Sequence, residues 1–243
     1  MEMFKMTVDE ICALDPDLAI IPVGSLEQHG PHLPIMTDWI IASELGKRVA
    51  ERMNAFLIPA LPISTCREHM GKKGSVWMEP TTFYKMMYDV IMSLKEQGFK
   101  RVGIIITHGG VFIAGPLVRD LNAKFNPDLQ VALVNSDVID YNSIAETPGL
   151  HADESETSQI LAIAPETVHM DKAKDYNPDV PRRYLNYGSI FRAAPDGVWG
   201  CPTKATAEKG ERILDLSVET IVNELNKAFD YMSKKEKIGY SNF

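Results

Sequence analysis

Short apolar runs alternate with amphipathic stretches along this chain. Residues 18–23 and 102–106 are continuous apolar runs, which is the pattern of strands buried on both faces of a sheet. Residues 130–135 form a further predicted strand. A run over residues 56–63 contains two prolines. We expect an irregular or edge strand there, because proline cannot donate a hydrogen bond to a neighbouring strand.

The amphipathic stretches between these runs predict helices. Apolar side chains recur every four residues from Ile41 to Met53, which is the spacing of one helix face. We expect this helix to begin near Asp38, with Thr37 or Asp38 as its cap. Further helices are predicted over residues 82–97, 113–125, 155–164 and about 205–234.

The alternation of strands and helices sets the predicted fold class. It predicts parallel β-α-β units in a three-layer α/β fold, with a mostly parallel central sheet flanked by helices. A length of 243 residues and the absence of repeats or linkers favour one domain over residues 1–243. Residues 176–202 are rich in Pro, Gly, Tyr and Asn and predict a long irregular segment, which is often functional.

Composition narrows the classes of function. The formal net charge is −8 and no concentrated basic patch is present, so nucleic acid is not an expected partner. No run of 18 apolar residues occurs, so no membrane association is expected. Three widely spaced cysteines and the lack of a signal peptide favour a reducing cytoplasm and argue against disulfides or a cysteine-based zinc site.

The first candidate site follows the first predicted strand. Glu27, His29, His32 and Asp38 lie within twelve residues of a loop that is interrupted by Gly and Pro. Carboxylates and imidazoles are the usual ligands of zinc, manganese or iron, and one carboxylate can bridge two ions. A polar turn whose histidines bind only backbone is the alternative, but four such residues together favour a metal site.

Two further clusters lie later in the chain. His108 follows the strand over residues 102–106, and Gly109 and Gly110 allow close approach of a ligand to the backbone. His151 and Glu156 flank the start of a predicted short helix. Asp153 and Glu154 in the same stretch suit a helix N-terminus without any chemical role.

Other catalytic motifs are incomplete or absent. Ser25 lacks the second glycine of the G-x-S-x-G nucleophile elbow. Neither the phosphate-binding G-x-x-x-x-G-K-[ST] motif nor the dinucleotide-binding G-x-G-x-x-G motif occurs. A nucleotide cofactor is therefore not expected.

The three clusters together resemble the creatininase (creatinine amidohydrolase) family. Residues 27–38 match E-x-H-G-x-H-L-P-x-x-T-D, residues 151–158 match H-A-x-x-x-E-T-S, and residues 196–210 resemble a late glycine-rich family segment. The resemblance implies a two-metal hydrolase that uses Zn, Mn or Fe. Glu27 and His108 would bind one ion, His29 the other, and Asp38 would bridge them. His151 resembles the catalytic histidine of the family.

The chain also departs from the family pattern. Creatininase takes a further glutamate ligand at the position of Gly110, and our hypothesis is that Glu156 replaces it as ligand and contributes to catalysis. Both asparagines of the usual family turn around His108 are missing, which puts creatinine itself in doubt as substrate. The residues that we expect to contact substrate are His32, Ser75, Trp77, Gly109, Gly110 and Trp199.

These features predict hydrolysis of a cyclic amide, a formamide or a related small carbonyl substrate by a metal-activated water. The alternatives are C–C cleavage of a cyclic diketone, a non-catalytic metal- or metabolite-binding protein, and a vestigial site completed by a partner. The resemblance also implies a homo-oligomer, possibly a hexamer. His69 either lines the site or belongs to an ordinary loop. Arg182 and Arg183 either bind a phosphate or carboxylate or lie in an exposed loop or subunit contact.

Overall fold

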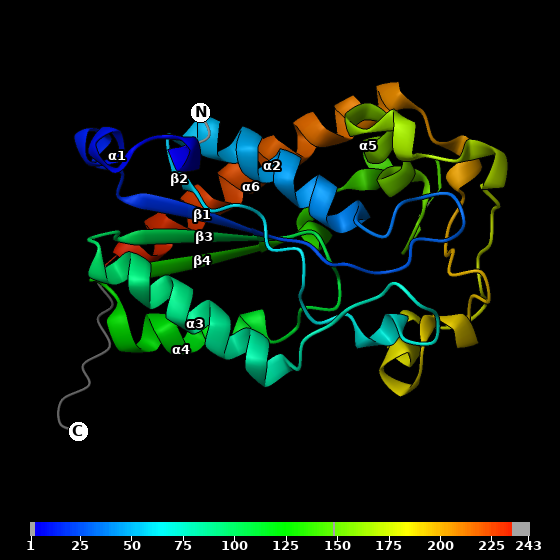
Figure 1. The fold of residues 1–243 in the computed structure, drawn as a ribbon, viewed down its shortest axis with the longest axis horizontal. Coiled ribbons are helices and arrows are strands. Elements are labelled where there is room, and N and C mark those ends of the chain that lie inside the picture. Colours follow the sequence, from blue (N-terminus) through cyan, green and yellow to red (C-terminus); the bar gives the residue numbers. More distant parts are fainter. Residues whose placement is uncertain (1–2, 148, 235–243) are drawn as a thin grey trace.

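The computed structural model describes residues 3–147 and 149–234. Four strands form one sheet in the order β2-β1-β3-β4, and every pair of neighbours is parallel. The expected α/β class is confirmed, with a sheet that is parallel throughout (Figure 1). The strands are β1 (Leu18–Val23), β2 (Phe56–Leu57), β3 (Arg101–Ile106) and β4 (Gln130–Asn135).

Helices cover both faces of the sheet and bury the alternating side chains of each strand. Ile20 points into the core beneath α2 and α6, whereas its neighbour Ile21 packs against α3 and α4. Among the described residues, no helix has both the length and the apolar character that a membrane crossing needs. The α-helices are α1 (Val8–Leu14), α2 (Thr37–Met53), α3 (Pro80–Glu96), α4 (Ala114–Phe125), α5 (Glu154–Ile163) and α6 (Ala207–Ser233).

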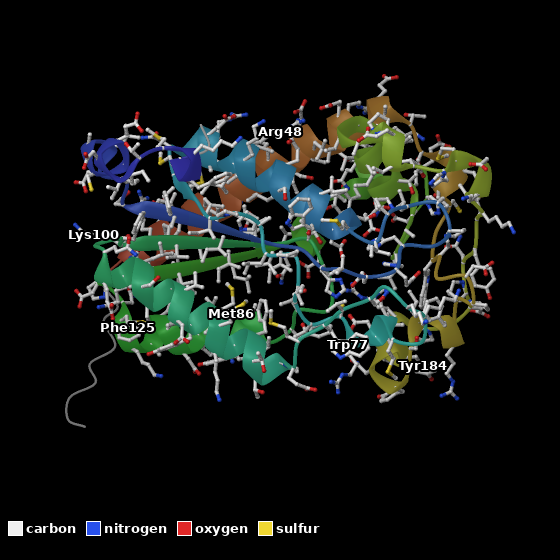
Figure 2. The ribbon with its side chains drawn as sticks, viewed as in Figure 1. Arg48, Trp77, Met86, Lys100, Phe125 and Tyr184 are labelled. Atoms are coloured by element: carbon white, nitrogen blue, oxygen red, sulfur yellow. The ribbon has the colours of Figure 1, made fainter. Side chains whose placement is uncertain are left out.

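Loops and short 3-10 helices gather beyond the carboxyl ends of the strands (Figure 1). Trp77 and Tyr184 lie at this end of the molecule, and Lys100 lies at the opposite end of the sheet (Figure 2). The predicted irregular segment over residues 176–202 is confirmed, since it contains only 3-10 turns and isolated bridges. The 3-10 helices are η1 (Met3–Lys5), η2 (Arg67–His69), η3 (Ser136–Val138), η4 (Tyr141–Ser143), η5 (Pro165–Thr167), η6 (Met170–Lys172), η7 (Arg182–Tyr187), η8 (Ile190–Arg192) and η9 (Pro202–Lys204).

The second predicted strand is much shorter than expected. Strand β2 ends at Leu57, and beyond it the chain contacts β1 through the Ile58 N–H, which donates to the Ile20 carbonyl, and through an isolated bridge between Leu61 and Val23. Pro59 and Pro62 explain the interruption, because neither has an N–H to donate to a sheet. The prolines thus leave this segment as the irregular edge of the sheet.

The predicted cap of α2 is wrong in a way that matters for the site. Met36 is the N-cap residue and makes no side-chain cap bond, while Thr37 and Asp38 already lie within the helix. The Asp38 carboxylate instead accepts a hydrogen bond from Ser25 Oγ at 2.7 Å. The Asp38 side chain faces the carboxyl end of the sheet, so it does not cap the helix in which it lies.

Candidate functional site

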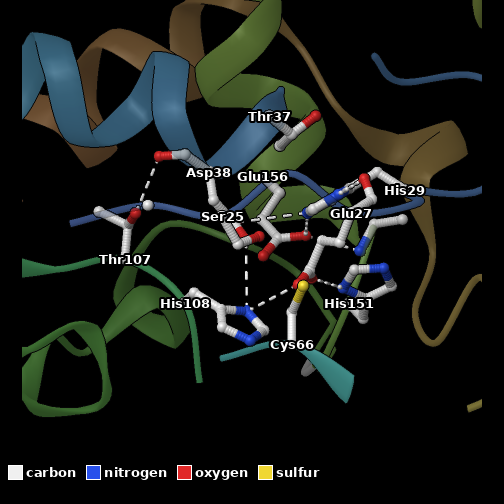
Figure 3. A network of polar contacts seen from close by, with 12 residues as sticks. Ser25, Glu27, His29, Thr37, Asp38, Cys66, Thr107, His108, His151 and Glu156 are labelled. Carbon is white, nitrogen blue, oxygen red and sulfur yellow. Dashed lines mark hydrogen bonds and ion pairs between the residues drawn. The ribbon is translucent and has the colours of Figure 1, made fainter. Parts of the chain in front are cut away.

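Polar side chains from distant segments converge at the carboxyl end of the sheet (Figure 3). Glu27 and His29 lie in the loop after β1, and Asp38 lies in the first turn of α2. His108 follows β3, His69 ends η2, and His151 and Glu156 flank the start of α5. Apart from the half-buried Glu156, these side chains are buried. The meeting of two strand ends therefore brings together the clusters that the sequence singled out.

Glu27, Asp38 and His108 form the first set of potential metal ligands. His108 Nδ1 lies 3.1 Å from Glu27 Oε2 and 3.3 Å from Asp38 Oδ2. Ligand atoms around a tetrahedral ion with bonds of 2.0–2.1 Å are about 3.3 Å apart. The ligand atoms of this set all lie within 4.8 Å of one another. Their spacing therefore suits a single divalent cation.

The hydrogen bonding of this set also fits a metal. Neither carboxylate oxygen of the fully buried Glu27 has a hydrogen-bond partner among the described residues, and the same holds for His29 Nε2. The ring nitrogens near Glu27 lie close to its oxygens but are not aligned to donate to them. Leaving a buried carboxylate without compensation is costly, and a cation between these atoms would remove that cost.

A second set, next to the first, consists of His29, His151 and Glu156, and His29 also faces Asp38. His29 Nε2 lies 3.4 Å from Asp38 Oδ1 and 3.7 Å from Glu156 Oε2. His29 Nδ1 lies 3.2 Å from the Glu27 carbonyl oxygen, which places a ring proton on Nδ1 and leaves Nε2 as the nitrogen that a cation would meet. Asp38 thus faces His108 with one oxygen and His29 with the other.

A third set of potential ligands overlaps the first. His69 Nε2 lies 3.2 Å and His151 Nδ1 lies 3.6 Å from Glu27 Oε1. These three residues are also compact enough for one ion. The His151 ring lies between those of His29 and His69, with centroid distances of 4.2 and 4.4 Å. Geometry alone therefore allows more than one position for a cation.

The site concentrates negative charge in a buried space. Burial opposes the charged form of His29, but the carboxylates of Asp38, Glu156 and Glu27 together outweigh burial and raise the pKa of His29 to about 10. Burial raises the pKa of Glu156 to about 8. Burial, together with His29, lowers the pKa of His151 well below its ordinary value. Without a cation, the carboxylates draw protons onto their neighbours, and a divalent ion would supply the same positive charge.

The site opens into a cavity of about 730 Å³. Gly109 and Gly110 line it together with Glu27, Asp38, His108, His151 and Glu156. The other expected substrate contacts are not among its lining residues. His32 Nε2 instead lies 3.0 Å from Thr157 Oγ1, Ser75 Oγ accepts the Gln28 N–H, and Trp199 pairs through its backbone with His151. Trp77 lies near the Arg67 guanidinium.

Several residues of the site were not predicted as functional. Glu68 lines the cavity, and its Oε1 lies 3.3 Å from His108 Nε2. Gln28 contacts His69 and His151. Arg182, for which the sequence left open a role in binding a phosphate or carboxylate, also lines the cavity and packs closely on Gly109. The sequence does contain one signal for Glu68 and His69, because an acid and a histidine stand side by side there in a loop after a predicted strand.

Ser25 is not placed as a nucleophile. Its side chain is fully buried, and its hydroxyl donates to the Asp38 carboxylate. Among the described residues the Ser25 hydroxyl donates to Asp38 and to no histidine, so the structure offers no Ser–His pair at this position. Ser25 instead holds the Asp38 carboxylate in place through this hydrogen bond.

Comparison with known proteins supports a hydrolase. The creatininase family profile, described as creatinine amidohydrolase, matches residues 4–225. The 3-dehydro-scyllo-inosose hydrolase of Thermotoga maritima is 29% identical over 252 residues, covering 88% of this chain and 79% of that protein. The mycofactocin precursor peptide peptidase of Mycobacterium ulcerans is 30% identical over 220 residues, covering 85% and 83%.

The fold also matches that of a solved structure. A crystal structure of creatinine amidohydrolase (creatininase) superimposes with a TM-score of 0.80 at 24% identity, covering 93% of this chain and 96% of that one. The family match extends over nearly the whole chain and includes every segment that contributes to the site. The chain therefore belongs to the creatininase family of amidohydrolase-type enzymes.

Proposed function

We propose that this protein is a divalent-metal-dependent hydrolase of a small carbonyl compound, such as a cyclic amide or a formamide. One observation carries the proposal. The buried Glu27 carboxylate and His29 Nε2 have no hydrogen-bond partner among the described residues, and they converge with Asp38, His108 and Glu156 at ligand spacing. Residues of these types in this arrangement match the preferences of Zn, Mn or Fe.

The ligand assignment follows from the two compact sets. Glu27 and His108 would hold one ion, His29 and Glu156 the other, and Asp38 would bridge them with its two oxygens. Glu156 supports this assignment because its carboxylate lies 3.7 Å from His29 Nε2, on the side of the second set. When bound, two such ions supply an activated water and polarise the substrate carbonyl.

His151 is the proposed proton shuttle. Its Nε2 lies 2.7 Å from the Gln28 carbonyl oxygen and 3.0 Å from Gln28 Nε2, and we assign the ring proton to Nε2 on the shorter contact. Its Nδ1 then faces the site with a free lone pair, 3.6 Å from Glu27 Oε1. The lowered pKa keeps this ring neutral near neutral pH, so Nδ1 can take up a proton and pass it to the leaving atom.

Hydrolysis assays test this proposal directly. Purified protein is incubated with cyclic amides, N-formyl compounds and cyclic diketones, and the products are followed by mass spectrometry. We expect turnover of one class, its loss with a chelator and its return with Zn or Mn. His151→Gln should lower kcat by about 10²–10⁴-fold, whereas the exposed His169→Gln should not change it.

The same assays separate the alternatives. Turnover of diketones alone would assign C–C cleavage in place of amide hydrolysis. Retained metal with no turnover of any class would contradict an enzyme of this substrate range and favour a binding protein. Turnover that survives complete metal removal would contradict the metal dependence.

A further inference from the structure

Gln28 lies between the candidate ligands and is held in one orientation. Its backbone N–H donates to Ser75 Oγ at 3.0 Å, and its side-chain Oε1 accepts the Gly30 N–H at 3.0 Å. Gly197 packs so closely that a Cβ there would lie 1.9 Å from Oε1. Because Oε1 is engaged by a donor, the NH₂ group is the end that faces the histidines.

The NH₂ group determines the tautomer of His69. Gln28 Nε2 lies 3.0 Å from His69 Nδ1 and can only donate. His69 Nδ1 must therefore be the acceptor, and a ring with protons on both nitrogens would set two donors against each other. The neutral His69 ring then carries its proton on Nε2, where Glu27 Oε1 lies 3.2 Å away.

The backbone of Gln28 determines the tautomer of His151. The Gln28 carbonyl oxygen lies 2.7 Å from His151 Nε2. Gln28 Nε2 lies 3.0 Å from the same nitrogen, but the carbonyl contact is the shorter one, and we assign the ring proton to His151 Nε2 on that contact. Both histidines are therefore Nε2–H tautomers, yet they present opposite ends to Glu27: the N–H of His69 and the lone pair of His151.

We infer that Gln28 is a positioning residue that keeps the proton of His69 on Nε2, so that His69 is not a metal ligand. A protonated Nε2 cannot coordinate an ion, so the set Glu27, His69 and His151 is removed from the candidate cation sites. The group of potential ligands that remains around Glu27 is then the one with Asp38 and His108. This inference rests on the proposed function for the ion beside His108.

Nitrogen NMR tests the inference without knowledge of the substrate. The chain has six histidines, so a long-range ¹H–¹⁵N spectrum of the zinc-loaded protein can be assigned with single His→Gln variants. We expect His69 to show a protonated Nε2 and an unprotonated Nδ1. A protonated Nδ1, or an Nε2 shifted to the metal-bound position, would overturn the inference even without a variant of Gln28.

The variant Gln28→Glu isolates the role of the amide. It keeps the size of the side chain and an acceptor for Gly30, but it removes the donor to His69. We expect His69 Nδ1 to move to the protonated position, and the exposed Gln97→Glu to leave it unchanged. An unprotonated Nδ1 in folded Gln28→Glu would overturn the inference. If wild-type protein takes up no zinc, the proposed function fails, and the spectrum of the metal-free protein still decides the tautomer.

Discussion

Gly110 shows how a single residue can reshape the site. The family resemblance places a glutamate ligand at this position, but a Cβ on Gly110 would lie 1.9 Å from Glu68 Oε1 and 2.4 Å from His108 Nε2. The Glu68 carboxylate thus fills the space that a side chain at 110 would need. A negative charge remains at this point, but it comes from another segment and contacts the outer nitrogen of His108.

The steric conflict between Gly110 and Glu68 can be measured. We predict that Gly110→Ala lowers the free energy of unfolding by about 1–3 kcal/mol, because the added methyl group overpacks the site. In a Glu68→Ala background the same substitution should cost much less, as a double-mutant cycle in urea denaturation would show. Gly115→Ala is the control, since a Cβ there meets nothing within 4 Å. If Gly110→Ala lowered the free energy of unfolding equally in the wild-type and Glu68→Ala backgrounds, the steric conflict with Glu68 would be refuted.

The sequence predicts some residues of the site and not others, for a physical reason. Glu27, His29 and His108 directly follow buried strands, and parallel strands bring their carboxyl ends together. Glu68 contacts His108, which is distant in sequence, and Gln28 contacts His151 through its backbone carbonyl. The local spacing of residues in the sequence does not reveal such contacts. His32 matches the family motif but turns away to Thr157.

At the scale of elements, Glu154 connects α5 to α6 through a buried ion pair. Its side chain is fully buried and pairs with Lys209 Nζ of α6 at 2.6 Å. It also accepts the backbone N–H groups of Glu146 and Thr147 and the Thr147 hydroxyl. Burial by itself would raise the pKa of Glu154, but the Lys209 hydrogen bond and these backbone donors lower it. The folded protein therefore favours the charged form.

The resulting pH dependence has a definite sign. A lowered pKa contributes stability above the unfolded value of about 4.3 and loses it as the pH falls through the folded value. We predict that Glu154→Gln lowers the free energy of unfolding by about 2–3 kcal/mol at pH 7, and that its difference from wild type shrinks below about pH 4. The exposed Glu208→Gln should have little effect. A difference that is constant from pH 7 to pH 3 would contradict this role of the charge.

Element boundaries were predictable where local signals were strong. Strands β1 and β4 match the predicted ranges, because an apolar run bounded by turn residues defines them. Helix α1 was not predicted, although Thr7 and Glu10 form a capping box, since it is short and none of its residues is buried. The difference between predicted and observed β2 comes from its prolines.

At the scale of the whole molecule, one sheet separates two cores and positions the site at its carboxyl edge. The apolar alternation that builds both cores is visible in the sequence, so the fold class was predictable. The cavity was not predictable, because residues from the 182–190 stretch line it together with the candidate metal ligands, and this stretch belongs to a long irregular segment. Within that cavity, only the ligand sets explain why so many acids and histidines are buried together.

Metal content per chain tests the central claim most directly. Protein purified without chelator and supplied with Zn or Mn is analysed by elemental mass spectrometry, alongside Glu27→Gln and the exposed control Glu96→Gln. We predict about two ions per chain in the wild type and the control, and loss of at least one ion in Glu27→Gln. A wild-type protein that takes up no ion, or a Glu27→Gln variant that keeps both, would contradict the account.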